Sequence, residues 1–566
     1  MLHITLPILH YRASAIMDAH SVSFTSVAQR STSRIWQDLK TCRPHISLTG
    51  LQSRPLMSGR QSPRLSLCKR RAAIADRKPH IGIIGAGLAG LRCADVLLQQ
   101  GFHVTIIEGR NRLGGRVHQV RMPAGYLVDA GPNWIHGTSD NPILDIAKQT
   151  ATPVGTWDSN TYLFDDKGDA VPLAEAEIYS TMMWDIIEAA FLHSNKNCAN
   201  ITPDESLWDF FQLEVARRLP ESEADSLRKR DLVFQIAESW GAFVGSHIFG
   251  QSLKYFWLEE CIEGENLFCA GTYEKILAAI AAPAQAQADM RLNTVLTKVH
   301  CTGDTSGSVV VETDKGSFEF DEVVCTMPLG WLKRNAVHAF HPPLPQSIIH
   351  GIENIGYGCL EKVYISFRSA FWTKSDDTQN TVKGFCQWLR PDYAPGTNPK
   401  RWNQETVELA CLAPEASHPT LLFYIYGDQS RYLTSEVAKF STEDKKAAFL
   451  YEWFRPYYSR LPQYSSESAD CDPTGYFATN WLADDLAGNG SYSNFQVGLE
   501  HGDRDIEAMR KGCPERGLWL AGEHTAPFVA LGTATGAYWS GESVGKRIAD
   551  AYGRGVGVHG QAAAPA

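Results

Sequence analysis

Three glycines and one acidic residue near residue 85 have the types and spacing of a phosphate-binding turn. Gly85, Gly87 and Gly90 follow an apolar run at 80–84, and Glu108 ends the next apolar run. In a strand–turn–helix–strand unit, the first glycine allows a tight turn, the second lets the backbone approach a pyrophosphate, and the third lets the helix pack on the strand. The acid accepts hydrogen bonds from a ribose diol. The segment therefore predicts a dinucleotide site of the Rossmann type.

Two arginines directly after this unit extend the predicted site. Arg110 and Arg116 lie in "GRNRLGGR" at 109–116, beside flexible glycines. Guanidinium groups pair well with phosphate oxygens, so the segment suits a second contact with the pyrophosphate. A solvated basic loop is the alternative interpretation.

The elements that must position these residues change in type along the chain. The pattern is mostly helical and Trp-rich from 142 to 283, and strands return at 290–301, 308–328 and 359–367. The chain then ends in loop, strand and helix. This order predicts an α/β protein with more than one domain.

Composition indicates a soluble globular protein. The chain has 566 residues, of which 44% are hydrophobic and 20% are charged, and this length exceeds that of one ordinary domain. We expect no transmembrane helix, because no run of about 18 apolar residues occurs. The 13 cysteines include no C-x-x-C pair, so we expect neither disulfides nor a metal site. Reduced thiols in an intracellular protein are the simplest interpretation.

Charge is divided unevenly along the chain. The first 78 residues contain 13 Lys or Arg and 3 Asp or Glu, which leaves 40 basic and 60 acidic residues in the remainder. A strongly negative body attracts cations and repels nucleic acid. We therefore expect a small cationic partner and no nucleic acid.

The leader at 1–78 is basic and rich in Ser and Arg. Three interpretations stay open: a mitochondrial transit peptide, a disordered tail, or a gene model extended before Met17 or Met57. No basic segment precedes the apolar "ITLPIL", and the chain ends without S-K-L. A cytoplasmic or mitochondrial location is expected.

Seven motifs together resemble a known family. They are "HIGIIGAGLAG", "EGRNRLGGR", "DAGPNWIHG", "VVCTMPLGWLK", "LEKVYISF", "GSYS" and "LAGEHT…GAYWSG". They occur in the order found in flavin-containing amine oxidases, and the chain most resembles polyamine oxidases, especially fungal ones. The resemblance covers residues 79–552, and the joint occurrence of the motifs is far more specific than any one of them.

The resemblance implies a Rossmann-like, discontinuous FAD-binding domain joined to an α+β substrate-binding domain. The expected ranges are 1–78 for the leader, 79–145, 285–345 and 470–555 for the FAD-binding domain, 146–284 and 346–469 for the substrate-binding domain, and 556–566 for a flexible tail.

The family likeness also implies noncovalent FAD. Ser491 stands where monoamine oxidases carry the cysteine that attaches the flavin. Glu523 would reach the ribityl or pyrophosphate region. The helix start at Thr535 and Gly536 would face the N1–C2 carbonyl edge of the isoalloxazine and favour the negative charge of reduced flavin by about 0.3–1 kcal/mol. A glycine-rich turn capped by Glu523 is the alternative. The expected cofactor contacts are Gly85, Gly87, Gly90, Glu108, Arg110, Arg116, Trp134, Val295, Trp481, Glu523, Thr535 and Gly536.

Three residues are expected to act in catalysis. Lys362 lies on the polar side of an alternating strand, where a lysine is usually solvated, but the matching family lysine holds a water near flavin N5. His136, in "NWIHG", would border the substrate tunnel, or it is simply a loop histidine bonded to backbone. Trp481 resembles the family's tryptophan beside the flavin.

Substrate contacts are expected from His136, Tyr492 and Thr533. Thr533 stands where other members place a tyrosine, so a full aromatic cage is not expected and a long, flexible amine is favoured. Four acids in "LEECIEGENL" either line a channel for cations or form a solvated face: Glu259, Glu260, Glu263 and Glu265.

The expected activity is FAD-dependent oxidation of a polyamine or acetylated polyamine. Hydride would pass from the α-carbon of the amine to flavin N5, water would hydrolyse the imine to an aldehyde and a shorter amine, and O2 would become H2O2. An L-amino-acid or other primary-amine oxidase, and a non-catalytic flavin-binding regulatory protein, are the alternatives. A histone-lysine demethylase is disfavoured, because no long heptad hairpin is evident. The oligomeric state and the preferred amine stay open.

Overall fold

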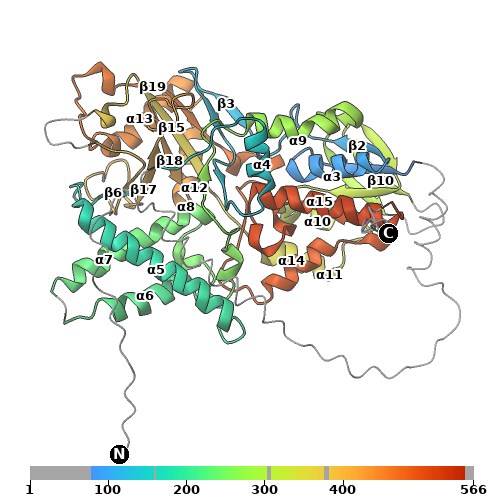
Figure 1. Ribbon diagram of the computed structural model, residues 1–566, viewed down its shortest axis with the longest axis horizontal. Helices are drawn as coiled ribbons and strands as arrows, with labels where there is room; N and C mark the ends of the chain where they lie inside the picture. The colour runs from blue at the N-terminus through green and yellow to red at the C-terminus, as the bar shows by residue number, and fades with distance from the viewer. Residues whose placement is uncertain (1–77, 158–160, 223, 302–307, 375–380, 555–566) are drawn as a thin grey trace, which may run out of the picture.

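A computed structural model describes residues 78–157, 161–222, 224–301, 308–374 and 381–554. The expected leader, except for its last residue, and the expected C-terminal tail lie outside the described residues. Figure 1 shows two halves side by side: a parallel sheet with α3 and α15 on the right, and a second sheet above the helices α5–α7 on the left.

The first half is built on a five-stranded parallel sheet in the order β21-β12-β1-β2-β8. Its strands are β1 (His80–Ile84), β2 (His103–Ile107), β8 (Asp289–Arg291), β12 (Glu322–Cys325) and β21 (Leu518–Leu520). They come from three separated parts of the chain, so this half is discontinuous. One apolar core joins the sheet to α3 (Leu88–Gln99), α9 (Glu274–Gln287) and α15 (Ala534–Ala551).

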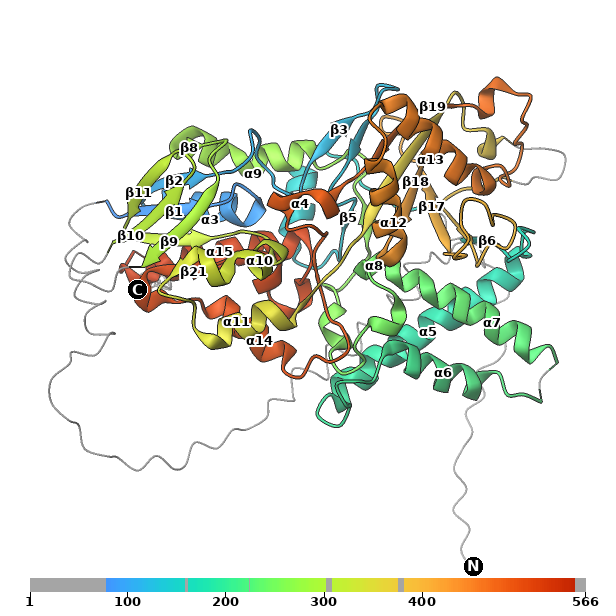
Figure 2. The same cartoon turned by 180° about the vertical axis from the view of Figure 1, so that it is seen from behind.

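A second core of the same half involves a smaller sheet, in the order β11-β10-β9-β13, and three helices. The elements are β9 (Leu296–Cys301), β10 (Val309–Thr313), β11 (Gly316–Phe320), β13 (Phe340–His341), α10 (Leu329–Ala339), α11 (Gln346–Asn354) and α14 (Gly502–Lys511). In Figure 2 these elements lie beside the parallel sheet.

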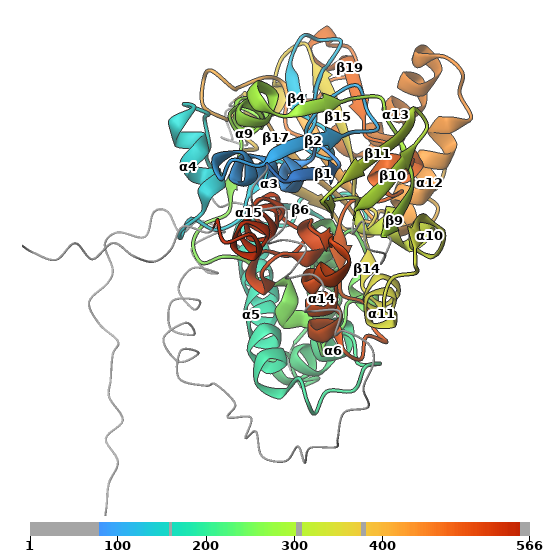
Figure 3. The ribbon, with the colours of Figure 1, turned by 90° about the vertical axis from the view of Figure 1, so that its right-hand side faces the viewer.

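The second half contains a mixed six-stranded sheet in the order β19-β15-β18-β17-β16-β6. Its strands are β6 (Thr161–Phe164), β15 (Glu361–Phe367), β16 (Phe385–Trp388), β17 (Gln404–Glu408), β18 (Thr420–Ile425) and β19 (Pro473–Ala478). Helices α12 (Gly427–Ala438) and α13 (Glu443–Tyr458) cover one face. Helices α5 (Leu173–Asn197), α6 (Leu207–Arg218) and α7 (Ser226–Ala237) share a separate core, and Figure 3 shows α5 and α6 below the sheets.

Two predicted domain boundaries fall inside single packing units. The boundary after residue 345 separates α11 from its own core, because Ile348 and Ile352 pack with Ile506 and Met509 of α14. The boundary before residue 470 assigns β19 to the FAD-binding half, yet β19 pairs with β15 in the six-stranded sheet. Tertiary pairing is not visible in local sequence, so ranges taken from the family resemblance can cut through such units.

Several short elements complete the fold. They are β3 (Gln119–Arg121), β4 (Leu127–Asp129), β5 (Trp134–Ile135), α4 (Pro142–Gln149), α8 (Gly241–Val244), β7 (Leu267–Phe268), β14 (Gly356–Tyr357) and β20 (Ser493–Asn494). Among the described residues, no helix is long and apolar enough to cross a membrane.

Candidate active site

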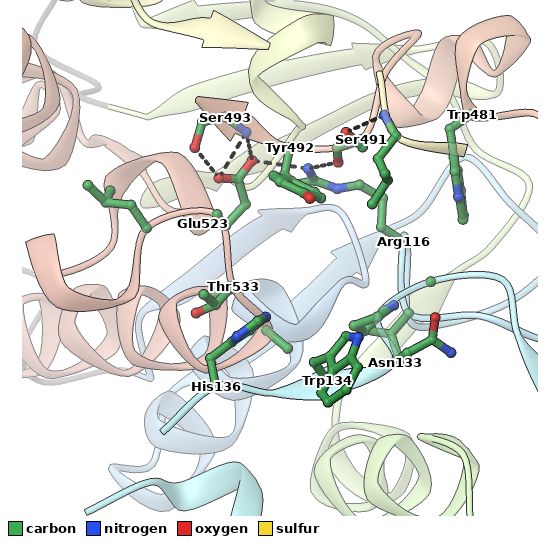
Figure 4. A pocket seen from close by; sticks show the side chains of 18 of the residues that line it. Arg116, Asn133, Trp134, His136, Trp481, Ser491, Tyr492, Ser493, Glu523 and Thr533 are labelled. Carbon is green, nitrogen blue, oxygen red and sulfur yellow. Dashed lines mark hydrogen bonds and ion pairs between the residues drawn. The ribbon is translucent and has the colours of Figure 1, made fainter. Parts of the chain in front are cut away.

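A cavity of about 550 Å³ lies where the two halves meet. Its lining includes the glycine turn after β1 and the first residues of α15 on one side, and β15, β16, β17 and β18 on the other. Figure 4 shows Arg116 reaching toward Ser491 and Glu523, with Trp134 and His136 opposite them. Residues that are far apart in the described chain therefore line a single cavity.

The glycine turn has the geometry that its spacing predicts. Gly85 has a φ of 108°, and a Cβ there would lie 2.4 Å from Thr326 Oγ1. A Cβ on Gly90 would lie 2.0 Å from the carbonyl oxygen of Gly85, so the helix packs against the turn. At Gly87 a Cβ would meet nothing closer than 4.0 Å, and no side chain caps the N-terminus of α3 there. Helix N–H groups are thus left to bind an anion from the cavity.

Glu108 is buried beside this turn. Its carboxylate accepts hydrogen bonds from the backbone N–H of Ala86, at 2.7 Å, and of Arg110, at 2.9 Å. A carboxylate has about four acceptor sites, so Glu108 fixes the turn and keeps capacity for a ribose. Val295, another expected contact, lines the cavity nearby.

The expected arginines are held by acids. Arg116 donates to Glu523 Oε1 at 3.0 Å and to the carbonyl oxygen of Ser491 at 2.7 Å, and Arg110 pairs with Asp484 at 2.8 Å. Burial would raise the pKa of Glu523, but Arg116 and a hydrogen bond from Ser493 Oγ lower it below its usual value. Glu523 therefore stays ionised and joins the arginine loop to the C-terminal segment.

Lys362 is buried, unlike a typical lysine on a polar strand face. Val363, Ile365 and Phe367 pack on the α12–α13 side of the sheet, as the alternation predicts. Lys362 takes the other face, lines the cavity, and donates through Nζ to the carbonyl oxygen of Gly131. Burial lowers the pKa of Lys362 despite the neighbouring carboxylates of Asp129 and Glu361.

His136 and Trp481 also line the cavity. The His136 Nδ1 position lies 3.3 Å from Asn266 Oδ1, and burial lowers the pKa of His136, so the ring is neutral near pH 7. Trp481 donates from Nε1 to the carbonyl oxygen of Ala130 at 3.1 Å, which fixes its ring. Trp134 likewise donates to the Tyr424 hydroxyl at 3.2 Å.

Polar side chains at the start of α15 form hydrogen bonds within the protein. Thr533 caps the helix by accepting from Gly536 N–H at 2.9 Å, and its hydroxyl donates to the carbonyl oxygen of Ala530 at 2.7 Å. Thr535 donates to Asn141 Oδ1 at 3.0 Å. Gly90, Thr535 and Gly536 are absent from the cavity lining, whereas Thr533 is part of it. The Thr533 hydroxyl is therefore engaged in the cap, and this residue contributes a wall of the cavity.

The four acids of 258–267 separate into two pairs. Glu259 and Glu260 line the cavity, but Glu263 and Glu265 do not. Glu259 accepts from Phe495 N–H at 3.3 Å, and burial raises its pKa to about 8. Burial also raises the pKa of Glu260, which accepts from Asn195 at 3.4 Å.

Tyr492 and several residues that the motifs do not indicate complete the cavity. The Tyr492 hydroxyl donates to the carbonyl oxygen of Phe243 at 2.6 Å, which directs the ring along the wall. The residues that sequence reasoning missed are Trp157, Trp184, Phe191, Trp240, Phe385, Gln387, Glu405 and Tyr424. All but Trp157, which lies in a loop before β6, belong to helices or strands, and the only signal of the group in the sequence is that six of the eight are aromatic.

The fold and the glycine turn define a dinucleotide-binding α/β protein with a second half beside the cofactor site (Figure 1). The family model for flavin-containing amine oxidoreductases matches residues 88–549. The chain therefore belongs to this family, and its cofactor is FAD. The open turn at Gly87, the uncapped helix and the buried acid Glu108 fit this cofactor.

Individual proteins support this assignment. The chain is 28% identical to probable polyamine oxidase 4 of Arabidopsis thaliana over 82% of its length and 86% of that protein. It is 27% identical to lysine-specific histone demethylase 1 homolog 3 of Oryza sativa subsp. indica over 78% of its length and 51% of that protein. A double mutant of putrescine oxidase shares the fold with a TM-score of 0.60 and 15% identity, over 84% of this chain and 99% of that chain.

Proposed function

We propose that this flavin amine oxidase acts on polyamines or their acetylated derivatives. The observation that carries the proposal is the shared cavity of Lys362, Glu259 and Glu260 between aromatic walls. Aromatic faces and carboxylates together suit a chain of methylene groups that carries several positive charges.

Two acids of the cavity, Glu259 and Glu260, lack cationic partners among the described residues. Among the described residues, Glu259 and Glu260 form no ion pair with Lys or Arg, and burial raises the pKa of each. A buried carboxyl that is costly to ionise gains most from an incoming cation. An ammonium group would therefore restore the charged form of these acids and be bound strongly.

The positions of the arginines oppose the amino-acid oxidase alternative. Such an enzyme needs an arginine to pair with the substrate carboxylate. The arginines in the cavity lining are Arg110 and Arg116, which are paired with Asp484 and Glu523 on the cofactor side. In the described chain, no arginine lines the substrate side of the cavity.

The roles of the residues follow from their protonation states. Bound FAD supplies the hydride acceptor and passes electrons to O2. A reacting amine must be unprotonated, because its lone pair stabilises the developing imine. The neutral ring of His136 adds no positive charge that would repel the amine. Lys362 is the residue that would hold a water through Nζ, and this water would serve imine hydrolysis or reoxidation of the flavin.

Anaerobic reduction of the bound flavin tests the proposal. Purified holoprotein would be mixed with spermine, spermidine, acetylated spermine, benzylamine or L-leucine while the oxidised-flavin absorbance is followed. We expect fast bleaching by a polyamine and slow or no bleaching by benzylamine and L-leucine. Preferred bleaching by L-leucine would move the protein to the amino-acid oxidases. No bleaching by any amine would support a flavin-binding regulatory protein instead.

A further inference from the structure

Four polar residues form a row across the six-stranded sheet. Lys362 of β15 lies opposite Tyr424 of β18, Tyr424 lies opposite Glu405 of β17, and Glu405 lies opposite Gln387 of β16. Directly opposed residues on neighbouring strands point to the same face of a sheet. All four line the cavity, so the row leads along the cavity wall away from Lys362.

Glu405 is a buried carboxylate in the middle of this sheet. Its side chain accepts one hydrogen bond, from Gln387 Nε2 at 2.7 Å. In the described part of the chain no Lys or Arg pairs with it, and Glu405 and Gln387 are only 8% and 5% exposed. Gln387 Oε1 is buried with no hydrogen-bond partner among these residues. At the cavity wall, Gln387 Oε1 therefore lacks a donor, and Glu405 lacks a paired Lys or Arg among the described residues.

Aromatic rings surround the path between Lys362 and Glu405. Tyr424 stands between them in the row, and Phe385 stacks on Trp134 at 6.0 Å between centroids. Trp157 meets Phe385 edge-on at 5.9 Å. Such walls favour methylene groups and, near their faces, a cation. An unpaired acid at the end of an apolar slot is costly unless a ligand cation reaches it.

We propose that Glu405 and Gln387 bind the second ammonium group of the substrate and thereby select diamines and polyamines over monoamines. The assignment rests on the proposed function, which places the reacting carbon near Lys362. Strands lie about 4.8 Å apart, so two strand spacings separate Lys362 from Glu405 by roughly 10 Å. An aminoalkyl chain spans such a distance, and an acetylated end would lack the charge that Glu405 needs.

Binding measurements on the holoprotein test this assignment without requiring turnover. Putrescine and butylamine differ by one terminal ammonium group, and their dissociation constants can be measured by calorimetry. We expect the wild type to bind putrescine more tightly than butylamine. Glu405→Gln should weaken the binding of putrescine by on the order of 30-fold and change the affinity for butylamine little. Gln387→Met, which removes the free acceptor, should weaken the binding of putrescine less than Glu405→Gln does.

A charge control separates local from long-range effects. Glu319→Gln removes one exposed negative charge from β11, in the small sheet outside the cavity lining, and should leave both affinities unchanged. Flavin content and thermal unfolding confirm that each variant is folded. The assignment would be overturned if the wild type bound the two amines with equal affinity. It would also be overturned if Glu405→Gln lost the same factor of affinity for both amines. Tight putrescine binding without flavin reduction by any polyamine would instead defeat the proposed function alone.

Discussion

At the scale of single residues, burial determines the chemistry of the cavity. Lys362, Glu259 and Glu405 are ordinary surface residue types, yet each lines the cavity with its pKa shifted toward the neutral form. Desolvation is the largest cause for all three, because burial disfavours charge. Their protonation therefore responds strongly to a bound cation or anion.

Replacing Lys362 should separate the two half-reactions. Lys362→Met would remove the water that we propose Nζ holds, so reoxidation of the reduced flavin by O2 should slow by on the order of 100-fold. Anaerobic reduction by spermidine should change less. Stopped-flow absorbance measures both steps.

A second lysine with a lowered pKa serves as the control for Lys362. Lys333 bonds the carbonyl oxygen of Glu353 and is absent from the cavity lining. The reduced flavin of Lys333→Met should be reoxidised at the same rate as that of the wild type. If flavin reoxidation slows to the same extent in both lysine variants, or if it is normal in Lys362→Met, the role proposed for Lys362 is wrong.

Glu259 should make the amine-free protein less stable at alkaline pH. Burial raises its pKa in the folded state to about 8, above the unfolded value. The folded state thus binds the extra proton, and stability falls as pH rises from the unfolded pKa through about 8. Glu259→Gln removes this titration, so its Tm relative to the wild type should be higher at about pH 9 than at about pH 6. A pH-independent difference in Tm would contradict the burial of a protonated Glu259.

At the scale of elements, strand register and helix starts bring the functional groups together. The N-terminus of α3 opens toward the cavity at Gly87, whereas Gly90 is covered by the preceding turn. The row from Lys362 to Gln387 exists only because β15, β18, β17 and β16 pair in one register. A shift by one residue would turn these side chains to the α12–α13 face.

Two alanine variants should distinguish the roles of the turn glycines. Gly90→Ala places a Cβ against the carbonyl oxygen of Gly85, so it should destabilise the apoprotein by about 1–3 kcal/mol. The Cβ of Gly87→Ala would lie in open space, so this variant should keep the stability of the apoprotein. It should weaken the binding of FAD by on the order of tenfold, which corresponds to about 1.4 kcal/mol. Thermal unfolding and flavin titration measure the two effects. Equal losses of stability would show that Gly87 is also a packing position.

At the scale of the whole molecule, charge favours a cationic substrate. Beyond the first 78 residues, acidic side chains exceed basic ones by 60 to 40. Such a field attracts cations over several ångströms to tens of ångströms, and salt screens it.

The rate of substrate capture should therefore depend on ionic strength. Raising it from about 0.01 M to about 0.15 M shortens the Debye length from about 30 Å to about 8 Å. We expect kcat/KM for spermidine to fall by about 3- to 10-fold and that for butylamine to fall less. Steady-state rates measured with a neutral osmolyte at matched osmolality provide the control. An equal fall for both amines would argue against steering by charge.

The local sequence by itself determined the cofactor turn. Gly85, Gly87, Gly90 and Glu108 lie within one strand–turn–helix–strand unit, and their spacing dictates the turn because neighbouring residues share backbone geometry. The alternation of β15 likewise predicted which face Lys362 would take.

Only the tertiary structure decided what surrounds that face. The pattern of β15 was equally consistent with a solvated lysine, and packing of the second half against the cofactor half buried it. Glu405 and Glu259 became cavity residues, while Glu263, four positions after Glu259, did not. Burial and long-range pairing depend on contacts between residues that are distant in the chain, and spacing along the chain does not encode them.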